Sequence, residues 1–362
     1  MADPNAFLHG PRRRNLAILT AAAALSVALA VLSLSHQASL VAPKYAPTEF
    51  FPGLSAKMRD VALIRVESKK AGRFEIAFKP SAGWVLPSMH DYPADFDQGR
   101  TTLVGMAGLQ TVAPRTARAG WLHYLGLDTP AKGGTGTEIS LLDEKGHVIA
   151  AMIAGNTKDI GDPSAEGLFV RRPDSNQSWL ARSVFEPKPD PNDWLKKDVI
   201  SIDRARIQEA DVQPVDGPSY VVRREKPSDP DFQLLNMPKG RALGYVTAPD
   251  GVAAAIVGFT FDKVAPATQF DFSDAGRLIT RTFDGLEVTT SVLQQGGASW
   301  AMISADAVPG KADAQQEAHA INKAAGGWAF EIPAYKSAQF LTSRDSLLKP
   351  VEGEGKKPVR KK

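Results

Sequence analysis

The chain has 362 residues, of which 43% are hydrophobic and 23% are charged. These proportions are typical of globular domains, so a sizeable core can form and global disorder is excluded. The 26 prolines and 30 glycines favour many short elements joined by turns. The chain contains no cysteine, which excludes disulfides, thiolate metal sites, cysteine nucleophiles and a lipidated N-terminal cysteine.

The net charge of +3 is unevenly distributed along the chain. Residues 1–35 carry a charge of +2 and residues 349–362 carry +4, which leaves −3 for residues 36–348. A body this close to neutral lacks the broad basic surface that binding to a phosphate backbone requires. We therefore expect no nucleic-acid partner, and we expect the basic tail, residues 349–362, to be disordered.

An uncharged apolar run from Leu16 to Ser35 follows a basic N-terminal segment, residues 1–15. Its length matches the roughly 20 residues that a helix needs to span the core of a bilayer. Three arginines precede the run directly: Arg12, Arg13 and Arg14. By the positive-inside rule, the N-terminus then stays in the cytoplasm and the rest of the chain crosses the membrane. We expect residues 16–35 to be a single-pass anchor in the bacterial inner (cytoplasmic) membrane, with the body in the periplasm.

Two other interpretations of this run compete with that of an anchor. A cleavable signal peptide would have a shorter apolar region and end at a small-x-small site. The best small pair here, Ser33 and Ser35, is a poor one, and cleavage there would leave a mature N-terminus near His36. A buried helix of a soluble protein is disfavoured because the run is apolar on all faces.

After a proline-containing stalk, residues 36–58, the hydrophobic pattern changes to that of short strands. Apolar runs predict strands at Val61–Val66, Phe74–Phe78 and Trp84–Leu86. Apolar residues at helical spacing predict a helix over Phe96–Leu109. Two hairpins and a short helix are expected next: Glu138–Leu142 with Val148–Ile153, Leu168–Arg171 with Ser178–Ala181, and the helix around Asp193–Lys197.

A similar order of elements is expected after residue 203. The predicted strands are Ala205–Gln208, Tyr220–Arg223, Phe232–Leu235, Gly276–Phe283, Leu286–Leu293, Trp300–Ile303 and Trp328–Ile332. An alanine-rich helix is expected over Ala312–Ala325.

Two short segments recur at an offset of about 153 residues. Leu103-Val-Gly105 and Val112-Ala-Pro114 correspond to Ile256-Val-Gly258 and Val264-Ala-Pro266. Two halves with the same order of elements can each bury one face of a sheet. The sequence therefore predicts an α+β fold, with an N-terminal transmembrane helix followed by a tandem pair of similar antiparallel-sheet-plus-helix repeats at 59–203 and 204–348. Chance similarity is the alternative, because the identities are few.

Several of these segments also occur together, in this order, in one bacterial family. They are Trp84-Val-Leu86, Tyr92-Pro-Ala-Asp95, Val112-Ala-Pro114, Leu125-Gly-Leu127, Pro130, Leu168-Phe-Val-Arg171, Trp179-Leu180, Asp193-Trp-Leu195 and Ile202. On this ordered set the chain resembles the domain of unknown function 4340 family. The resemblance covers most of the chain after the apolar run and is stronger in the first half, while the second half departs from the better-known pattern.

The resemblance implies a single-pass membrane protein encoded beside ABC-transporter components of the gliding-motility type. It therefore implies a non-enzymatic accessory protein of an envelope transporter, with the permease or a large auxiliary membrane subunit as its partner. The family assigns no catalytic residues, so none is carried over to this chain. The departure in the second half leaves open whether that half keeps the role of the first.

No motif in the chain predicts a catalytic residue, a cofactor or a metal site. The six histidines are scattered, without a closely spaced pair of metal ligands. The densest acidic group is Asp91, Asp95 and Asp97, which suits a cation or ligand site. Turn formation and helix N-capping explain these aspartates more simply. An envelope hydrolase is disfavoured because no nucleophile elbow is present.

Two arginine pairs follow predicted strands, Arg171-Arg172 in the first half and Arg223-Arg224 in the second. They are suited to contact with acidic glycans, lipid headgroups or a partner, and the protection of a sheet edge explains them equally well. The alternative to an accessory subunit is a tethered extracytoplasmic binding module for a glycan, peptide or lipid. Such a module needs a concave apolar pocket with a few convergent polar groups.

Overall fold

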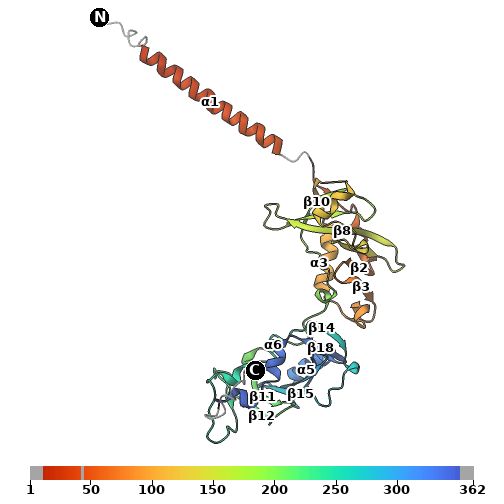
Figure 1. Ribbon diagram of the computed structural model, residues 1–362, viewed down its shortest axis with the longest axis vertical. Helices are drawn as coiled ribbons and strands as arrows, with labels where there is room; N and C mark the ends of the chain where they lie inside the picture. Colours follow the sequence, from red (N-terminus) through yellow and green to blue (C-terminus); the bar gives the residue numbers. More distant parts are fainter. Residues whose placement is uncertain (1–10, 42–44, 351–362) are drawn as a thin grey trace, which may run out of the picture.

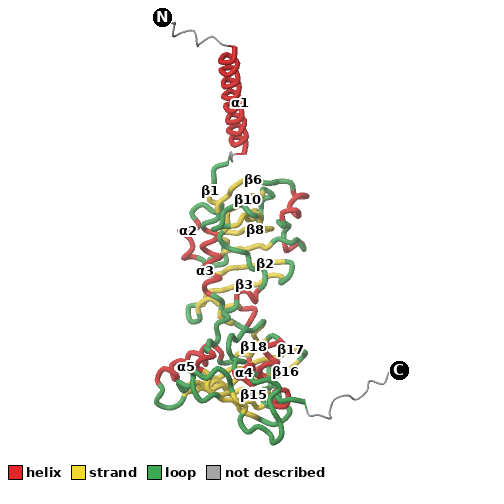
Figure 2. The backbone as a smooth tube through the Cα atoms, turned by 90° about the vertical axis from the view of Figure 1, so that its left-hand side faces the viewer, coloured by secondary structure: helices red, strands yellow, loops and turns green. Residues whose placement is uncertain are grey.

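The computed structural model describes residues 11–41 and 45–350. Most of the N-terminal segment predicted to be cytoplasmic, part of the predicted stalk and the basic tail from residue 351 lie outside the described residues. Figures 1 and 2 show a single helix, α1, followed by two lobes that lie one beyond the other along the long axis.

The N-terminal helix α1 runs over Pro11–Val41 and includes the whole apolar run. The large apolar side chains of α1 that the structure describes are exposed; Leu25 and Val27, for example, are 63% and 64% exposed. Among the helical residues that the structure describes in full, no helix is both long and apolar enough to span a bilayer. The backbone of Arg12, Arg13 and Arg14 belongs to α1, and their side chains lie outside the description.

The first lobe is built on a ten-stranded sheet in which every pair of neighbours is antiparallel. Its strands are β1 (Thr48–Glu49), β2 (Leu63–Ser68), β3 (Gly72–Lys79), β4 (Gly83–Leu86), β5 (Tyr92–Pro93), β6 (Gln110–Pro114), β7 (Thr137–Leu142), β8 (Val148–Lys158), β9 (Glu166–Arg171) and β10 (Ser178–Ser183). Their order across the sheet is β1-β6-β10-β9-β8-β7-β2-β3-β4-β5. The α-helices are α2 (Leu54–Lys57) and α3 (Phe96–Ala107), and the 3₁₀ turns are η2 (Met58–Asp60), η3 (Pro87–Met89), η4 (Ala119–Leu125), η5 (Pro130–Lys132) and η6 (Pro191–Trp194).

The second lobe is built on an eight-stranded antiparallel sheet. Its strands are β11 (Ile207–Gln213), β12 (Tyr220–Arg223), β13 (Gln233–Leu234), β14 (Lys263–Pro266), β15 (Gly276–Thr282), β16 (Leu286–Gln295), β17 (Ala298–Ala307) and β18 (Trp328–Ile332). The helices are α4 (Ala248–Ala253), α5 (Ala312–Ala325) and α6 (Ala334–Phe340), with 3₁₀ turns η7 (Arg204–Arg206), η8 (Ala267–Gln269) and η9 (Arg344–Leu347). The expectation of an α+β chain with antiparallel sheets is confirmed.

The two sheets share one connectivity. From its β6 position, the first sheet reads β6-β10-β9-β8-β7-β2-β3-β4, and the second reads β14-β18-β17-β16-β15-β11-β12-β13. Each strand has a counterpart at the same place, and α3 precedes β6 as α4 precedes β14. The recurring segments Val112–Pro114 and Val264–Pro266 lie in the equivalent strands β6 and β14. The lobes differ in the additional strands β1 and β5 and in α5, which separates β17 from β18.

Alternation of apolar and polar residues fixes which face of each sheet is covered. In β2 every second residue is buried, including Ile64 and Val66. Helix α5 covers β16 and β17 with Ala314, Ala318 and Ile321, whose spacing places them on one helical face. The predicted helix at Ala312–Ala325 and the predicted strand at Trp328–Ile332 are both confirmed.

The predicted strand at Ala205–Gln208 was wrong over its first half. Asp203 accepts a hydrogen bond from the backbone N–H of Ala205 and starts the 3₁₀ turn η7, so β11 begins only at Ile207. The helix predicted around Asp193–Lys197 is the 3₁₀ turn η6, which ends at Trp194. In both places an aspartate that caps a turn overrode the strand or helix pattern of the neighbouring residues.

Tyr92 joins the two lobes. It belongs to β5 at the edge of the first sheet, yet its ring makes edge-to-face contacts with Phe261, Trp328 and Phe330 of the second lobe, at centroid distances of 6.0, 5.0 and 6.3 Å. Its hydroxyl donates to the carbonyl oxygen of Lys196 at 2.9 Å. Burial raises the pKa of this hydroxyl, and the charge of Asp198 adds to the effect.

Lys197 reinforces this joint from the first lobe. Its Nζ donates to the carbonyl oxygen of Phe261 at 2.7 Å and lies 4.2 Å from the centre of the Phe261 ring. Residues 194–196 run beside β5, with the backbone N–H of Asp95 donating to Trp194 and that of Lys196 donating to Pro93. The joint is therefore part of one continuous apolar core.

We predict that Tyr92→Ala destabilises the chain by about 3–5 kcal/mol, because it empties a buried aromatic site. Tyr92→Phe removes only the hydrogen bond to Lys196 and should cost about 1 kcal/mol. Urea unfolding of the full chain measures both changes. The control is Tyr335→Ala, since Tyr335 is 59% exposed; equal unfolding midpoints for Tyr92→Ala and Tyr335→Ala would contradict the joint.

Candidate functional site

The three predicted aspartates lie around the start of α3 and make separate contacts. The Asp95 carboxylate caps α3 by accepting from the backbone N–H groups of Asp97 and Gln98 at 2.8 and 3.0 Å. Asp97 is exposed and lies 3.4 Å from the guanidinium of Arg100. Within the described residues, no group of three histidine, aspartate or glutamate side chains could hold a metal ion.

Asp91 is part of a strained turn. Its φ angle of 65° and that of the preceding His90, 57°, both lie in the left-handed region. The Asp91 carboxylate pairs with the ammonium group of Lys79 at 2.7 Å. The turn redirects the chain from β4 into β5, and so it places Tyr92 at the joint between the lobes.

Asp95 and Asp97 border a surface cavity of about 590 Å³, whose other lining residues include Trp84, Phe96 and Lys196. A larger cavity of about 810 Å³ lies between the end of β8, the loop at 159–165 and residues 183–186. Among the acidic residues that line this cavity, Asp162 accepts hydrogen bonds from Ser164 and Arg182. These hydrogen bonds lower the pKa of this carboxyl to about 2.

Arg171 is buried at the end of β9, and its guanidinium donates hydrogen bonds to neighbouring groups of the first lobe. Its Nε donates to the carbonyl oxygen of Leu127 at 2.8 Å, and its Nη2 donates to the Thr129 hydroxyl at 2.7 Å. The remaining nitrogen donates to three carbonyl oxygens of the β9–β10 turn: those of Arg172, Pro173 and Ser175. This side chain joins the turn to the loop at 127–129.

Arg172 contacts Phe50 and Phe51, in the segment where the chain enters the first lobe. Its Nη2 donates to the carbonyl oxygen of Phe50 at 2.9 Å. The guanidinium carbon also lies 5.5 and 5.3 Å from the ring centres of Phe50 and Phe51. Contacts of this kind between a cation and the aromatic face are stabilising.

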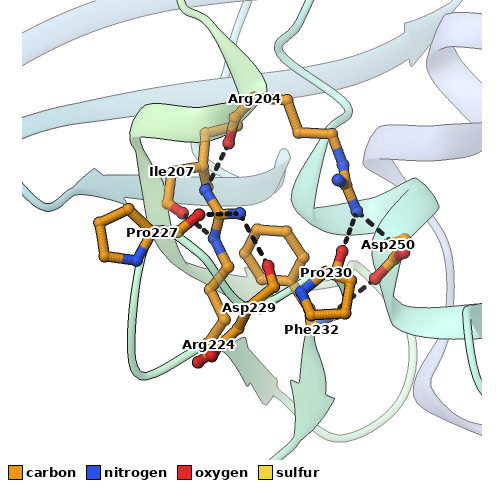
Figure 3. A network of polar contacts seen from close by, with 8 residues as sticks. All are labelled: Arg204, Ile207, Arg224, Pro227, Asp229, Pro230, Phe232 and Asp250. Atoms are coloured by element: carbon orange, nitrogen blue, oxygen red, sulfur yellow. Dashed lines mark hydrogen bonds and ion pairs between the residues drawn. The ribbon is translucent and has the colours of Figure 1, made fainter.

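Arg224 is a buried arginine of the second lobe and lies just after β12, the counterpart of β3 rather than of β9. Figure 3 shows its guanidinium enclosed by backbone carbonyls and beside the ring of Phe232. The five carbonyl oxygens that accept from it, at 2.7–3.4 Å, belong to Arg204, Ala205, Ile207, Pro227 and Asp229. Burial lowers the pKa of the guanidinium, and the charge of Arg204 lowers it further.

Arg204 extends this network to α4, as Figure 3 also shows. Its Nη2 donates to the carbonyl oxygen of Pro230 and to Asp250 Oδ2, both at 2.9 Å. The second oxygen of Asp250 accepts from the backbone N–H of Phe232 at 2.8 Å. The network therefore fixes the loop between β12 and β13 against the first turn of α4.

Arg223 points to the other side of β12, where it pairs with Glu209 of β11. Glu209 also accepts from Arg281 of β15 at 2.6 Å, and Arg281 pairs with Glu287 of β16 at 2.7 Å. These residues form a row of alternating charges across four neighbouring strands. The four predicted arginines thus make internal contacts, and none of them lines the two cavities described above.

Sequence reasoning missed one exposed group. Trp121 and Tyr124 are 55% and 72% exposed, and they border an apolar hollow of about 550 Å³ together with Arg115 and Arg118. The signal was present in the spacing: an arginine, a tryptophan and a tyrosine occur three residues apart at 118, 121 and 124. In a 3₁₀ helix this spacing places the side chains on one face.

The fold and these contacts define a class: an α+β protein of two consecutive antiparallel sheets of one connectivity, preceded by the helix α1. The family model described as Domain of unknown function (DUF4340) matches residues 84–276, more than half of the chain. The chain belongs to this family. The matched range begins in β4 and ends at the start of β15, so it includes Tyr92, Lys197 and Phe261 of the joint between the lobes but not Trp328 and Phe330. No curated protein and no solved structure matches the chain.

We predict that Arg224→Met destabilises the chain by about 2–4 kcal/mol, because it leaves buried carbonyl oxygens without donors. Arg224→Lys should recover only part of this loss, since an ammonium group cannot reach five acceptors at once. Thermal or urea unfolding of the full chain measures the effect. The matched control is Arg100→Gln, whose side chain is 63% exposed and should change stability by less than about 0.5 kcal/mol. Equal stability of Arg224→Met and the control would contradict a structural role for Arg224.

Proposed function

We propose that this protein is a non-enzymatic, membrane-anchored accessory protein. In this proposal, residues 16–35 are a single-pass anchor in the bacterial inner membrane, and both lobes lie outside the cytoplasm. The body then serves as an auxiliary component of an ABC-type transporter of the envelope. The observation that carries the proposal is the exposed apolar run of α1. In the body that follows, the candidate arginines donate hydrogen bonds to groups of the protein itself.

The character of α1 supports the anchor. It presents large apolar side chains on different sides of its axis, among them Leu19, Leu25 and Val31, which are 67%, 63% and 59% exposed and about 120° apart around the helix. A long helix that is apolar on all sides needs a non-aqueous environment to cover it. The arginines Arg12–Arg14 before this run support an orientation with the N-terminus in the cytoplasm.

The shared connectivity of the sheets supports a tandem repeat, with halves at 59–203 and 204–348. Equivalent strands occur in the same order across both sheets, and the recurring Val-Ala-Pro segments lie in equivalent strands. We propose that the halves arose by duplication.

The proposed partner is an ABC permease or its large auxiliary membrane subunit, as the resemblance to the family implies. We predict that the tagged full chain, expressed at its native level and extracted in mild detergent, co-purifies with such a subunit. A variant in which an unrelated transmembrane helix replaces residues 16–35 separates the contribution of the body from that of the anchor. Recovery of the tagged chain alone would contradict the accessory role.

A tethered extracytoplasmic binding module is the second candidate. The cavity of about 810 Å³ in the first lobe favours it, because its volume suits a small glycan or peptide. A ligand that binds the folded chain raises its unfolding temperature. A panel of glycans, peptides and lipids tested on the full chain in detergent, without any shift, would reject this candidate.

A further inference from the structure

The turn η4 has two faces of opposite character. A 3₁₀ helix has three residues per turn, so side chains three positions apart are aligned. Arg118, Trp121 and Tyr124 are exposed on one face, and we call them the η4 stripe. Leu122 and Leu125 lie on the inner face, where Leu122 packs with Leu127 and Ile153. The rings of Trp121 and Tyr124 therefore face solvent, while the apolar contacts of η4 with the lobe are made by the leucines on its other face.

The η4 stripe is on a firmly held support. Gly126, with a φ angle of 68°, ends the turn, and its backbone N–H donates to the carbonyl oxygen of His123 at 3.1 Å. The side chain of Asn156 donates to the carbonyl oxygen of Tyr124 at 3.4 Å. A Cβ atom at Gly155 would lie 2.1 Å from the carbonyl oxygen of Leu125, so only glycine permits this approach of β8 to η4. The exposure of the rings is thus built into the fold.

The chemistry around the η4 stripe combines aromatic rings with uncompensated positive charge. Residues 110–127 contain two arginines, Arg115 and Arg118, and no acid. The guanidinium of Arg118 lies 5.1 Å from the centre of the Trp121 ring. Within residues 45–350, neither arginine is paired with a carboxylate. Tryptophan and tyrosine concentrate at the headgroup level of bilayers, and arginines there are attracted to anionic lipids.

The η4 stripe belongs to the end of the body that the chain enters from α1. Tyr45, four residues beyond the end of α1, lies against Trp179 with ring centres 5.4 Å apart, and its hydroxyl is 2.8 Å from that of Thr111 in β6. Trp179 is the register partner of Pro114, the last residue of β6, and Arg115 follows directly. In Figure 2, β1, β6 and β10 are the labelled strands nearest to α1.

From this placement and chemistry, we propose that the η4 stripe docks onto the surface of the membrane that holds α1, with Trp121 and Tyr124 at the headgroup level and Arg115 and Arg118 against anionic headgroups. The inference rests on the proposed anchor. Helix α1 continues to Val41, and the four residues from there to Tyr45 reach at most about 14 Å when fully extended. This short connection keeps the stripe close to the lipid surface and favours lipid over a soluble partner.

Because the chain has no cysteine, a single introduced cysteine is a unique labelling site. The test places a spin label on the full chain at Tyr124→Cys, with Tyr245→Cys as the matched control in the second lobe; the two tyrosines are 72% and 67% exposed. A third variant, Val27→Cys, reports on the anchor. Each is reconstituted into bilayers of phosphatidylglycerol with phosphatidylcholine, or of phosphatidylcholine alone, and the accessibility of the label to oxygen and to a water-soluble nickel complex is measured.

Docking predicts that the label at position 124 becomes several-fold more accessible to oxygen relative to nickel in the anionic bilayer than the label at 245. Adding Arg115→Gln and Arg118→Gln should remove most of this difference. If the label at 27 is within the lipid and that at 124 matches the control, the inference fails and the anchor stands. If the label at 27 is also in water, the proposed anchor itself fails. Loss of access to both reagents at position 124 indicates a protein covering it, a second copy included, and overturns lipid docking.

Discussion

The insertion of Tyr92 into the second lobe is the contact on which the shape of the body depends. Without it, the two sheets would be connected chiefly by the segment between β10 and β11. Three aromatic rings surround Tyr92, and Lys197 adds a hydrogen bond to Phe261 from the same side. The centre of the joint consists of aromatic rings, and the hydrogen bond from the Tyr92 hydroxyl to Lys196 at its edge fixes the orientation of the Tyr92 ring. The body therefore acts as a single two-lobe unit.

Buried arginine and lysine side chains in both lobes donate hydrogen bonds to backbone carbonyl oxygens. Arg171 and Arg224 each collect carbonyl oxygens from two separate loops, and Lys336 donates to those of Ala255 and Val257 after α4. Loops of this kind have carbonyl groups that no strand partner satisfies, and a buried donor removes that cost. The same residues that look like an anion-binding surface in the sequence thus stabilise irregular backbone. Within residues 45–350, Arg118 of the η4 stripe and the neighbouring Arg115 make no such bonds to backbone carbonyl groups; both border the hollow beside Trp121 and Tyr124.

Local patterns predicted the order and kind of most elements. Alternation and turn residues gave the hairpins β7–β8 and β9–β10, and alanine-rich periodicity gave α5. Local patterns could not predict the burial of Arg171 or the role of Tyr92, because each depends on partners 42 or more residues away. The sequence predicted that helix capping explains Asp95, and the structure confirms it, because an N-cap depends only on neighbouring residues. The outward face of η4 was missed because its period of three differs from the helical and strand periods sought.

The contacts of Tyr92 and Lys197 imply that the two lobes form one rigid body. The most direct test of this rigidity is the distance between spin labels at Lys145→Cys in the first lobe and Ser273→Cys in the second, measured by pulsed EPR in the reconstituted full chain. Both positions are exposed. The account predicts one narrow distance distribution that broadens when Tyr92→Ala is added. A broad distribution in the chain with Tyr92 intact, unchanged by that substitution, would contradict it.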